Sequence, residues 1–178
     1  MLCLRGFECI FLSLVLITKL LTDSSLCWYA VKVFYNQTDS ICEKLAASGV
    51  EIYRQSIVPS YIFLHCCKEQ ILDIREKYFS KVYLYFNSDK KEPYVIPDKE
   101  MTIFMLVTSA GTEGLTYLGE DKAEYRQGDR VRVVEGPFKG AEGYIKRIKK
   151  DRKLIVSING VAAVAIANIH SQLLEKVS

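Results

Sequence analysis

The segment from Gly128 to Gly143 constrains the fold of this 178-residue chain more than any other stretch. Within it, Arg130 and Arg132 alternate with two valines, which is the period-two pattern of a strand with one buried face and one charged face. The segment ends in a corner that contains Pro137 and several glycines, which tolerate the backbone conformations of a tight turn. The pattern predicts a strand, a turn and the start of a second strand.

Further strand signals follow this segment. A charged turn at residues 149–153 precedes an apolar run, and Asn159-Gly160 then separates it from a second apolar run at residues 161–167. Asn-Gly between apolar runs is the strongest short signal for a hairpin. Closing short strands into a small barrel removes exposed edges. We therefore expect residues 125–178 to form an SH3-like β-barrel that binds a partner and does not catalyse.

The upstream part of the chain has the pattern of a split βαβ unit. The expected strands cover residues 28–35, 50–54, 61–66 and 82–86. One expected helix follows the first strand, with a capping box at Ser40 and a stop at Gly49, and the other covers residues 68–78. In this arrangement, a four-stranded antiparallel sheet carries both helices on one face. A further helix should begin near Pro97 and run to about residue 108. The expected fold class is α+β, with the split βαβ domain preceding the barrel.

Composition divides the chain into four segments. These are a leader at residues 1–26, a first domain at 27–108, a Gly-containing linker at 109–124 and the barrel at 125–178. The apolar tract at residues 115–118 interrupts the linker, and it can pack against either domain. The barrel segment holds 11 Lys and Arg against 5 Asp and Glu. Such a charge attracts RNA, DNA or an acidic protein surface, and the field alone does not choose among them.

The leader contains a short apolar run. Residues 10–17 are nearly all apolar and lie between Arg5 and Lys19, which resembles the core of a signal peptide. The run is far too short to cross a bilayer alone. Three interpretations stay open: an upstream start assignment, a genuine short amphipathic extension, or the leader of a secreted or membrane-tethered adaptor. We expect a cytoplasmic protein without membrane association.

The spacing of the cysteines and histidines indicates neither a metal site nor a catalytic site. The six cysteines contain no Cys-x-x-Cys pair, so we expect them to pack as small apolar residues and not to bind zinc. The two histidines, His65 and His170, belong to no catalytic arrangement, and the chain has no phosphate-binding glycine motif. We therefore expect no catalytic residue, no metal and no cofactor.

Four sequence segments in this order resemble the NusG family. They are Trp28-Tyr29 at the start of the first domain, Val58-Pro59-Ser60-Tyr61 in its middle, Ile96-Pro97 at its end, and then the segment from Gly128 to Gly143, which resembles a KOW domain. The tail at residues 163–175 is most similar to the UpxY antiterminators of surface-polysaccharide operons in Bacteroides-type bacteria. The resemblance covers residues 27–177.

The resemblance implies a factor that binds RNA polymerase and suppresses pausing or termination. The sheet face opposite the helices would dock on the clamp helices of the largest polymerase subunit, and this face should be exposed until the partner covers it. Its candidate residues are Tyr29, Pro59, Tyr61 and Phe63. Ser60 replaces the glycine of the family's Pro-Gly-Tyr, and residues 50–58 are shorter than usual, so a contact with non-template DNA through this segment is in doubt.

The barrel would bind a second partner while the protein acts as a monomer. In the family this partner is a ribosomal protein or a termination factor, and nascent RNA is a further candidate. The candidate contacts are Arg130, Arg132, Pro137, Phe138, Lys139, Lys146 and Arg147. A ribosomal or RNA-binding KOW protein is the alternative function. It would explain the basic barrel but not the Trp-Tyr opening.

Overall fold

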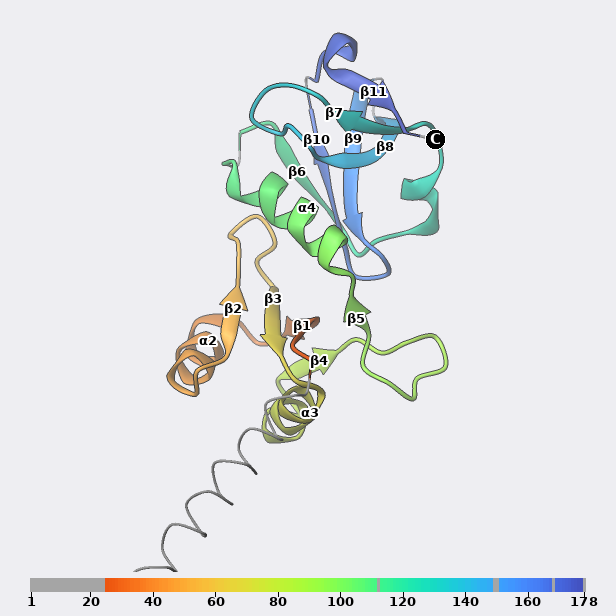
Figure 1. Cartoon of the computed structure of the whole chain (residues 1–178). Coiled ribbons are helices and arrows are strands. Elements are labelled where there is room, and N and C mark those ends of the chain that lie inside the picture. Colours follow the sequence, from red (N-terminus) through yellow and green to blue (C-terminus); the bar gives the residue numbers. More distant parts are fainter. Residues whose placement is uncertain (1–24, 112, 149–150, 168, 178) are drawn as a thin grey trace, which may run out of the picture.

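The computed structural model describes residues 25–111, 113–148, 151–167 and 169–177. The predicted leader therefore lies outside the described residues except for its last two. The amino-terminal unit consists of β1 (Cys27–Val33), α2 (Thr38–Ala47), β2 (Glu51–Tyr53), β3 (Tyr61–Cys66), α3 (Lys68–Lys77), β4 (Val82–Leu84), β5 (Val95–Ile96) and α4 (Asp98–Ser109). Figure 1 shows α2 and α3 beside this sheet and α4 between it and the rest of the molecule.

The first sheet has the topology of a split βαβ unit. Its strand order is β2-β3-β1-β4, with β5 paired to β1, and the pairs are antiparallel. One apolar cluster joins Tyr29 and Val31 of β1 with Ile41 of α2 and Ile71 of α3, so both helices cover the same face of the sheet. The predicted order of strands and helices is confirmed.

Strand β3 is buried on both faces. Ile62 and Leu64 belong to the cluster under α2 and α3, whereas Tyr61 and Phe63 belong to a second cluster on the opposite face. Each of the four side chains is at most 1% exposed. Four successive apolar residues in a strand require cover on both faces, and β3 therefore needs a second layer besides the helices.

The carboxy-terminal unit, residues 115–177, supplies part of that layer. It consists of β6 (Leu115–Gly119), η1 (Ala123–Arg126), β7 (Arg130–Val133), β8 (Glu142–Ile148), β9 (Asp151–Ile158), β10 (Ala162–Ile166), η2 (Ser171–Leu173) and β11 (Leu174–Lys176). The six strands form one antiparallel sheet in the order β11-β7-β8-β9-β10-β6. Two antiparallel sheets with few helices confirm the α+β class.

The predicted linker contains a strand. Within residues 109–124, β6 pairs with β10 from Leu115 opposite Ile166 to Gly119 opposite Ala163. Leu115 and Tyr117 of β6 pack against the buried cluster, which gives the strand its inward face. Residues 115–119 are therefore part of the second sheet and do not form a free connection.

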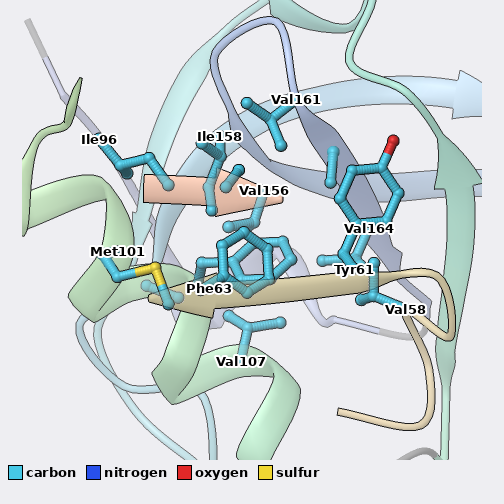
Figure 2. Close-up of a cluster of buried hydrophobic side chains, with 14 of the residues drawn as sticks. Val58, Tyr61, Phe63, Ile96, Met101, Val107, Val156, Ile158, Val161 and Val164 are labelled. Atoms are coloured by element: carbon cyan, nitrogen blue, oxygen red, sulfur yellow. The ribbon is translucent and has the colours of Figure 1, made fainter. Parts of the chain in front are cut away.

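One apolar core joins the two units. It contains Phe63 of β3, Phe104 of α4 and Val156 of β9, and Figure 2 shows residues of both sheets and of α4 around Tyr61 and Phe63. Helix α4 contributes its buried stripe to this core and faces both sheets. None of the described helices has the length and apolar character needed to span a membrane.

Candidate functional site

The candidate polymerase-binding face of β3 lies under α4 and the carboxy-terminal unit. The ring of Phe63 lies 5.4 Å from that of Phe104 on α4, and the ring of Tyr61 lies 6.3 Å from that of Tyr117 on β6, measured between centroids. Val156, Ile158 and Val164 of the second sheet belong to the same cluster. The face has a mixed aromatic and aliphatic cover that comes from the chain itself.

A pair of tyrosine hydroxyls lies at the edge of this face. The Oη atoms of Tyr61 and Tyr85 are 2.9 Å apart and share a hydrogen bond. Burial raises the pKa of Tyr61 well above its ordinary value, and burial likewise raises that of Tyr85 to about 12. Both phenols are therefore neutral at physiological pH, and their pairing reduces the cost of enclosing them.

The expectation of an exposed aromatic face is wrong for three of its four residues. Tyr61 and Phe63 do lie on the sheet face opposite α2 and α3, but each is only 1% exposed. Tyr29 points to the other face and packs among the helices. Pro59, which precedes β3, is exposed. The apolar face was expected to be exposed until another protein binds it, but α4 and the carboxy-terminal unit of the same chain cover it.

Polar contacts surround the apolar interface. Glu100 Oε2 on α4 accepts a hydrogen bond from the backbone N–H of Asn159 at 3.2 Å. Lys32 Nζ on β1 pairs with Glu120 Oε1 at 2.7 Å. Lys99 Nζ on α4 pairs with Glu142 Oε2 at 3.0 Å. The first two contacts lie near the surface and each contributes about 1 kcal/mol or less, so the shared apolar core dominates the free energy of closure.

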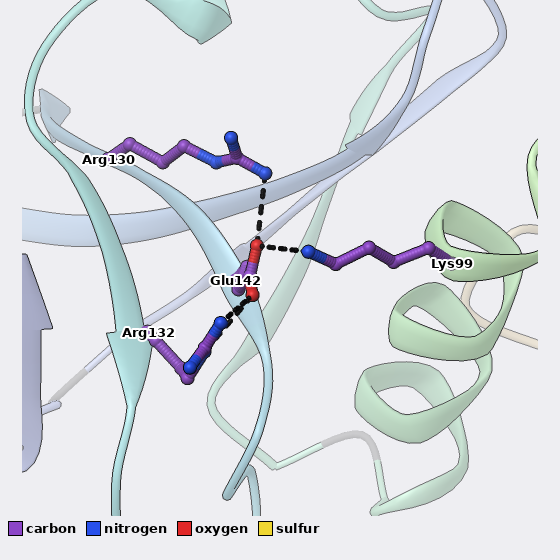
Figure 3. A network of polar contacts seen from close by, with 4 residues as sticks. All are labelled: Lys99, Arg130, Arg132 and Glu142. Atoms are coloured by element: carbon purple, nitrogen blue, oxygen red, sulfur yellow. Dashed lines mark hydrogen bonds and ion pairs between the residues drawn. The ribbon is translucent and has the colours of Figure 1, made fainter. Parts of the chain in front are cut away.

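A buried carboxylate joins the units most directly. The side chain of Glu142 on β8 is 4% exposed. It accepts hydrogen bonds from Arg130 Nη2 at 3.0 Å and from Arg132 Nε and Nη2 at 3.0 and 2.6 Å. Lys99 reaches the same carboxylate from α4, as Figure 3 shows. Three cations thus converge on one carboxylate, and the cluster keeps a net positive charge.

This cluster explains the protonation state of Glu142 and gives a structural role to two predicted partner contacts. Burial raises the pKa of the Glu142 carboxyl, but hydrogen bonds from Arg132 and Lys99 outweigh it and hold the pKa below its ordinary value. Arg130 and Arg132 were predicted as contacts for an external partner. Their guanidinium groups bind Glu142 and remain about half exposed. A partner that contacts these two arginines would contact side chains that are already bound to Glu142.

The other predicted contacts of the carboxy-terminal unit are spread over its surface. Lys146 Nζ donates to the backbone oxygen of Glu124 at 2.7 Å and is thus partly engaged. Phe138 is half-buried and packs against the shared core. Pro137, Lys139 and Arg147 are exposed. The structure brings Arg130 and Arg132 together at Glu142 and leaves the other five apart from this cluster.

Sequence reasoning missed Glu142 and Tyr117. Glu142 lies directly opposite Arg132 in the register of β7 and β8. Pairing the two strands across the predicted Gly-Pro turn would have placed the two opposite charges side by side and so indicated an ion pair. Tyr117 fell within the segment interpreted as a linker. Its apolar neighbours Leu115 and Leu118 were the available signal for a strand.

Comparisons with known proteins give weak likenesses over most of the chain and one motif match. No curated protein matches. A solved structure described as "Domain interaction in Thermotoga maritima NusG" has 22% sequence identity and a TM-score of 0.49, and the match covers 86% of this chain and 98% of that one. One described as "Crystal Structure of MjSpt4:Spt5 complex conformation B" has 15% identity and a TM-score of 0.31, covering 85% and 97%. Residues 127–159, from the end of η1 to the turn after β9, match the KOW motif.

Proposed function

We propose that this protein is a NusG-type transcription elongation and antitermination factor. The observation that carries the proposal is a split βαβ sheet, with Tyr61 and Phe63 on the face opposite its two helices, followed in the same chain by a unit that matches the KOW motif. In this function the apolar face of β3 binds the clamp helices of the largest RNA polymerase subunit. The function requires binding energy only, so it needs no catalytic group or cofactor.

The proposed binding face must be uncovered before a clamp helix can reach it. Tyr61 and Phe63 lie in a closed arrangement, so polymerase would select molecules in which α4 and the carboxy-terminal unit have moved away. The apparent affinity is then the intrinsic affinity reduced by the fraction of open molecules. A factor that binds one polymerase conformer more tightly shifts the population toward it, which disfavours the paused state.

The carboxy-terminal unit supplies the second attachment in this proposal. Once released, it would present Lys139, Arg147 and the Arg130–Arg132 pair to a ribosomal protein, a termination factor or nascent RNA in the cytoplasm. The resemblance of residues 163–175 to UpxY proteins supports a surface-polysaccharide operon as the target. Genomic position at the head of such a gene cluster would test this part of the proposal.

The proposal is tested by measuring binding of the full chain to a fragment that contains the polymerase clamp helices. Alanine at Tyr61 and Phe63 should abolish binding, but these are core residues and their loss would also destabilise the fold by several kcal/mol. The sharper variant is Lys99→Ala with Glu100→Ala, which removes two contacts across the interface. If opening limits binding, this variant should bind the clamp fragment about threefold to tenfold more tightly.

A matched control is Lys122→Ala with Glu124→Ala, which removes the same two kinds of charge from exposed positions at the start of η1. This control should bind like the parent chain. The proposal would be wrong if the parent chain and both variants fail to bind the clamp fragment and instead bind structured RNA with an affinity that falls steeply with salt. The ribosomal or RNA-binding alternative would then replace it.

A further inference from the structure

Three of the large apolar side chains that the amino-terminal unit leaves exposed gather at one edge of the first sheet. Phe79, which follows α3, is 74% exposed, Tyr83 of β4 is 52% exposed and Phe34, which follows β1, is 40% exposed. They line a groove of about 840 Å3 together with Leu84 and Phe86. Clustered exposed apolar residues of this kind mark an interaction surface. None of its described lining residues belongs to the buried cluster of Tyr61 and Phe63, although Tyr83 lies beside Tyr85 at the edge of that face.

The groove follows the outer edge of β4. Val82 and Leu84 pack toward the helices, whereas Tyr83 lies on the opposite side of the strand with its ring 5.1 Å from that of Tyr85. Residues from both sides of β4 line the groove. The groove therefore wraps around the strand edge, where β4 is the last strand of the described sheet order.

The edge carries backbone groups that can bind another strand. The Phe34 N–H donates to the Lys81 oxygen, and the Tyr85 N–H donates to the Ala30 oxygen. The hydrogen-bonded pairs of this ladder are therefore Phe34–Lys81, Ala30–Tyr85 and, midway between these two, Lys32–Tyr83. Bonded and non-bonded pairs alternate along an antiparallel ladder. Leu84, opposite Val31, falls in a non-bonded pair. Its N–H and C=O consequently point away from β1 and toward the groove.

Three cationic side chains contribute to the lining of the groove. Arg75 of α3 lies over the ring of Phe86, with 5.0 Å from its Cζ atom to the ring centroid. Lys90 and Lys91 come from the loop that follows β4. Of the described residues that line the groove, these three are cationic and none has a carboxylate. The charge therefore complements an acidic occupant.

We propose that this edge groove binds an extended acidic segment of a partner protein, which adds a strand to β4. The backbone of the segment would pair with Leu84, its apolar side chains would pack on Phe79 and Phe34, and its carboxylates would meet Lys90 and Lys91. Main-chain pairing supplies affinity in this mode and alternate side chains supply specificity. The site goes beyond the proposed function, because its described lining residues belong neither to the buried clamp-binding face nor to the KOW-matching segment.

The observations favour a peptide over a nucleic acid. A single-stranded nucleic acid requires stacking platforms and cations but makes no use of a strand edge. Here Arg75 already lies over Phe86, and the floor of the groove includes the buried aliphatic residues Val82 and Leu84. A second copy of this chain is disfavoured because its identical groove would bring the same cations face to face.

The test uses the full chain and four labelled probes in fluorescence polarisation. The first probe is the peptide Asp-Val-Glu-Phe-Asp-Val-Glu, and the second has lysine at every acidic position. The third is the acidic peptide with N-methyl groups on its five inner residues, which blocks both strand edges. The fourth is an oligothymidylate of matched length. Only the first should bind, and its binding should weaken with salt.

Two variants locate the binding to the groove. Phe79→Ser, and Lys90→Glu with Lys91→Glu, should each weaken binding of the acidic peptide about tenfold or more. The matched controls are Leu26→Ser, an exposed apolar residue outside the groove, and Lys122→Glu with Lys139→Glu in the carboxy-terminal unit. Both controls should bind like the parent. In amide exchange, the Leu84 N–H should gain protection when the peptide is added.

Three results would overturn the proposal. One is equal binding of the N-methylated peptide, because it would exclude strand addition. Another is binding of oligothymidylate, and not of the acidic peptide, that is lost in Phe79→Ser, which would assign the groove to nucleic acid. The last is absence of peptide binding together with a dimer that Phe79→Ser dissociates, which would assign it to a second copy.

Discussion

Gly143 lies where β8 passes closest to β9. A Cβ atom at this position would lie 2.2 Å from the backbone oxygen of Ile155 and 3.0 Å from a side-chain carbon of Leu154. Backbone cannot give way as the end of a flexible side chain can. The residue therefore fixes the approach of two strands that carry both Glu142 and part of the shared core.

We expect Gly143→Ala to lower the free energy of unfolding by about 3 kcal/mol, since the added methyl group forces the strands apart. Gly140→Ala is the control. Its Cβ would meet open space, and only its positive φ of 92° imposes strain, at about 1 kcal/mol. Urea unfolding followed by circular dichroism measures both values. An equal loss in the two variants would contradict the close approach.

Glu142 makes the link between β8 and α4 dependent on pH. Because its pKa in the folded protein lies below its ordinary value, the carboxylate stabilises the fold above the pKa of the unfolded chain, and this contribution is lost as pH falls through the folded pKa. Glu142→Gln leaves Arg132 and Lys99 without their anion. At pH 7 it should lower the free energy of unfolding by roughly 2 kcal/mol.

The difference between parent and Glu142→Gln should therefore shrink as the pH is lowered below about 4. Thermal unfolding between pH 3 and pH 7 measures this convergence. Glu175→Gln is a suitable control because Glu175 also lies opposite Arg132, in the register of β11, but is exposed. A difference that stays constant across the pH range would show that the cluster does not depend on the charge of Glu142.

The elements differ in how far the sequence determines them. The bounds of β3 were predicted correctly because flanking polar and turn residues delimit an apolar run. The same run is apolar on both faces, which indicates that other elements must pack on both faces of the strand. The run does not indicate which elements these are. Strand β6 was missed because Gly111 and Gly114 precede it and acids follow it. Its pairing with β10 depends on contacts distant in sequence, which local patterns do not contain.

At the scale of the whole molecule, the shared core should make the two units unfold together. Trp28, the single tryptophan, lies in the amino-terminal unit yet belongs to the same buried cluster as Val164 of β10. Val164→Ala should lower the free energy of unfolding by about 2 kcal/mol. The midpoints measured by Trp28 fluorescence and by circular dichroism should shift together.

The control is Val134→Ala, the same change at a position that is 36% exposed in the same unit, and it should leave both midpoints nearly unchanged. A Trp28 transition that does not respond to Val164→Ala would mean that the units unfold independently. The result also bears on the proposed function, because weakly coupled units would open readily and leave the face of β3 available to polymerase.

The candidate site illustrates the limit of sequence reasoning at this scale. The pattern of β3 correctly assigned Tyr61 and Phe63 to the face opposite α2 and α3. It could not reveal that residues about forty to one hundred positions later in the chain, from Phe104 to Val164, would cover that face. Tyr29 was misassigned because period two alone does not state which of two apolar faces meets the helices.

The contact between Tyr61 and Tyr117 also has a consequence for evolution. These two rings come from different units, so neither can change in size without altering how the other is enclosed. Among descendants of this chain, a smaller residue at one position should be tolerated best when its neighbour becomes larger. Lineages that permanently lost the closed arrangement would be released from this constraint and would accumulate unmatched exchanges at the two sites.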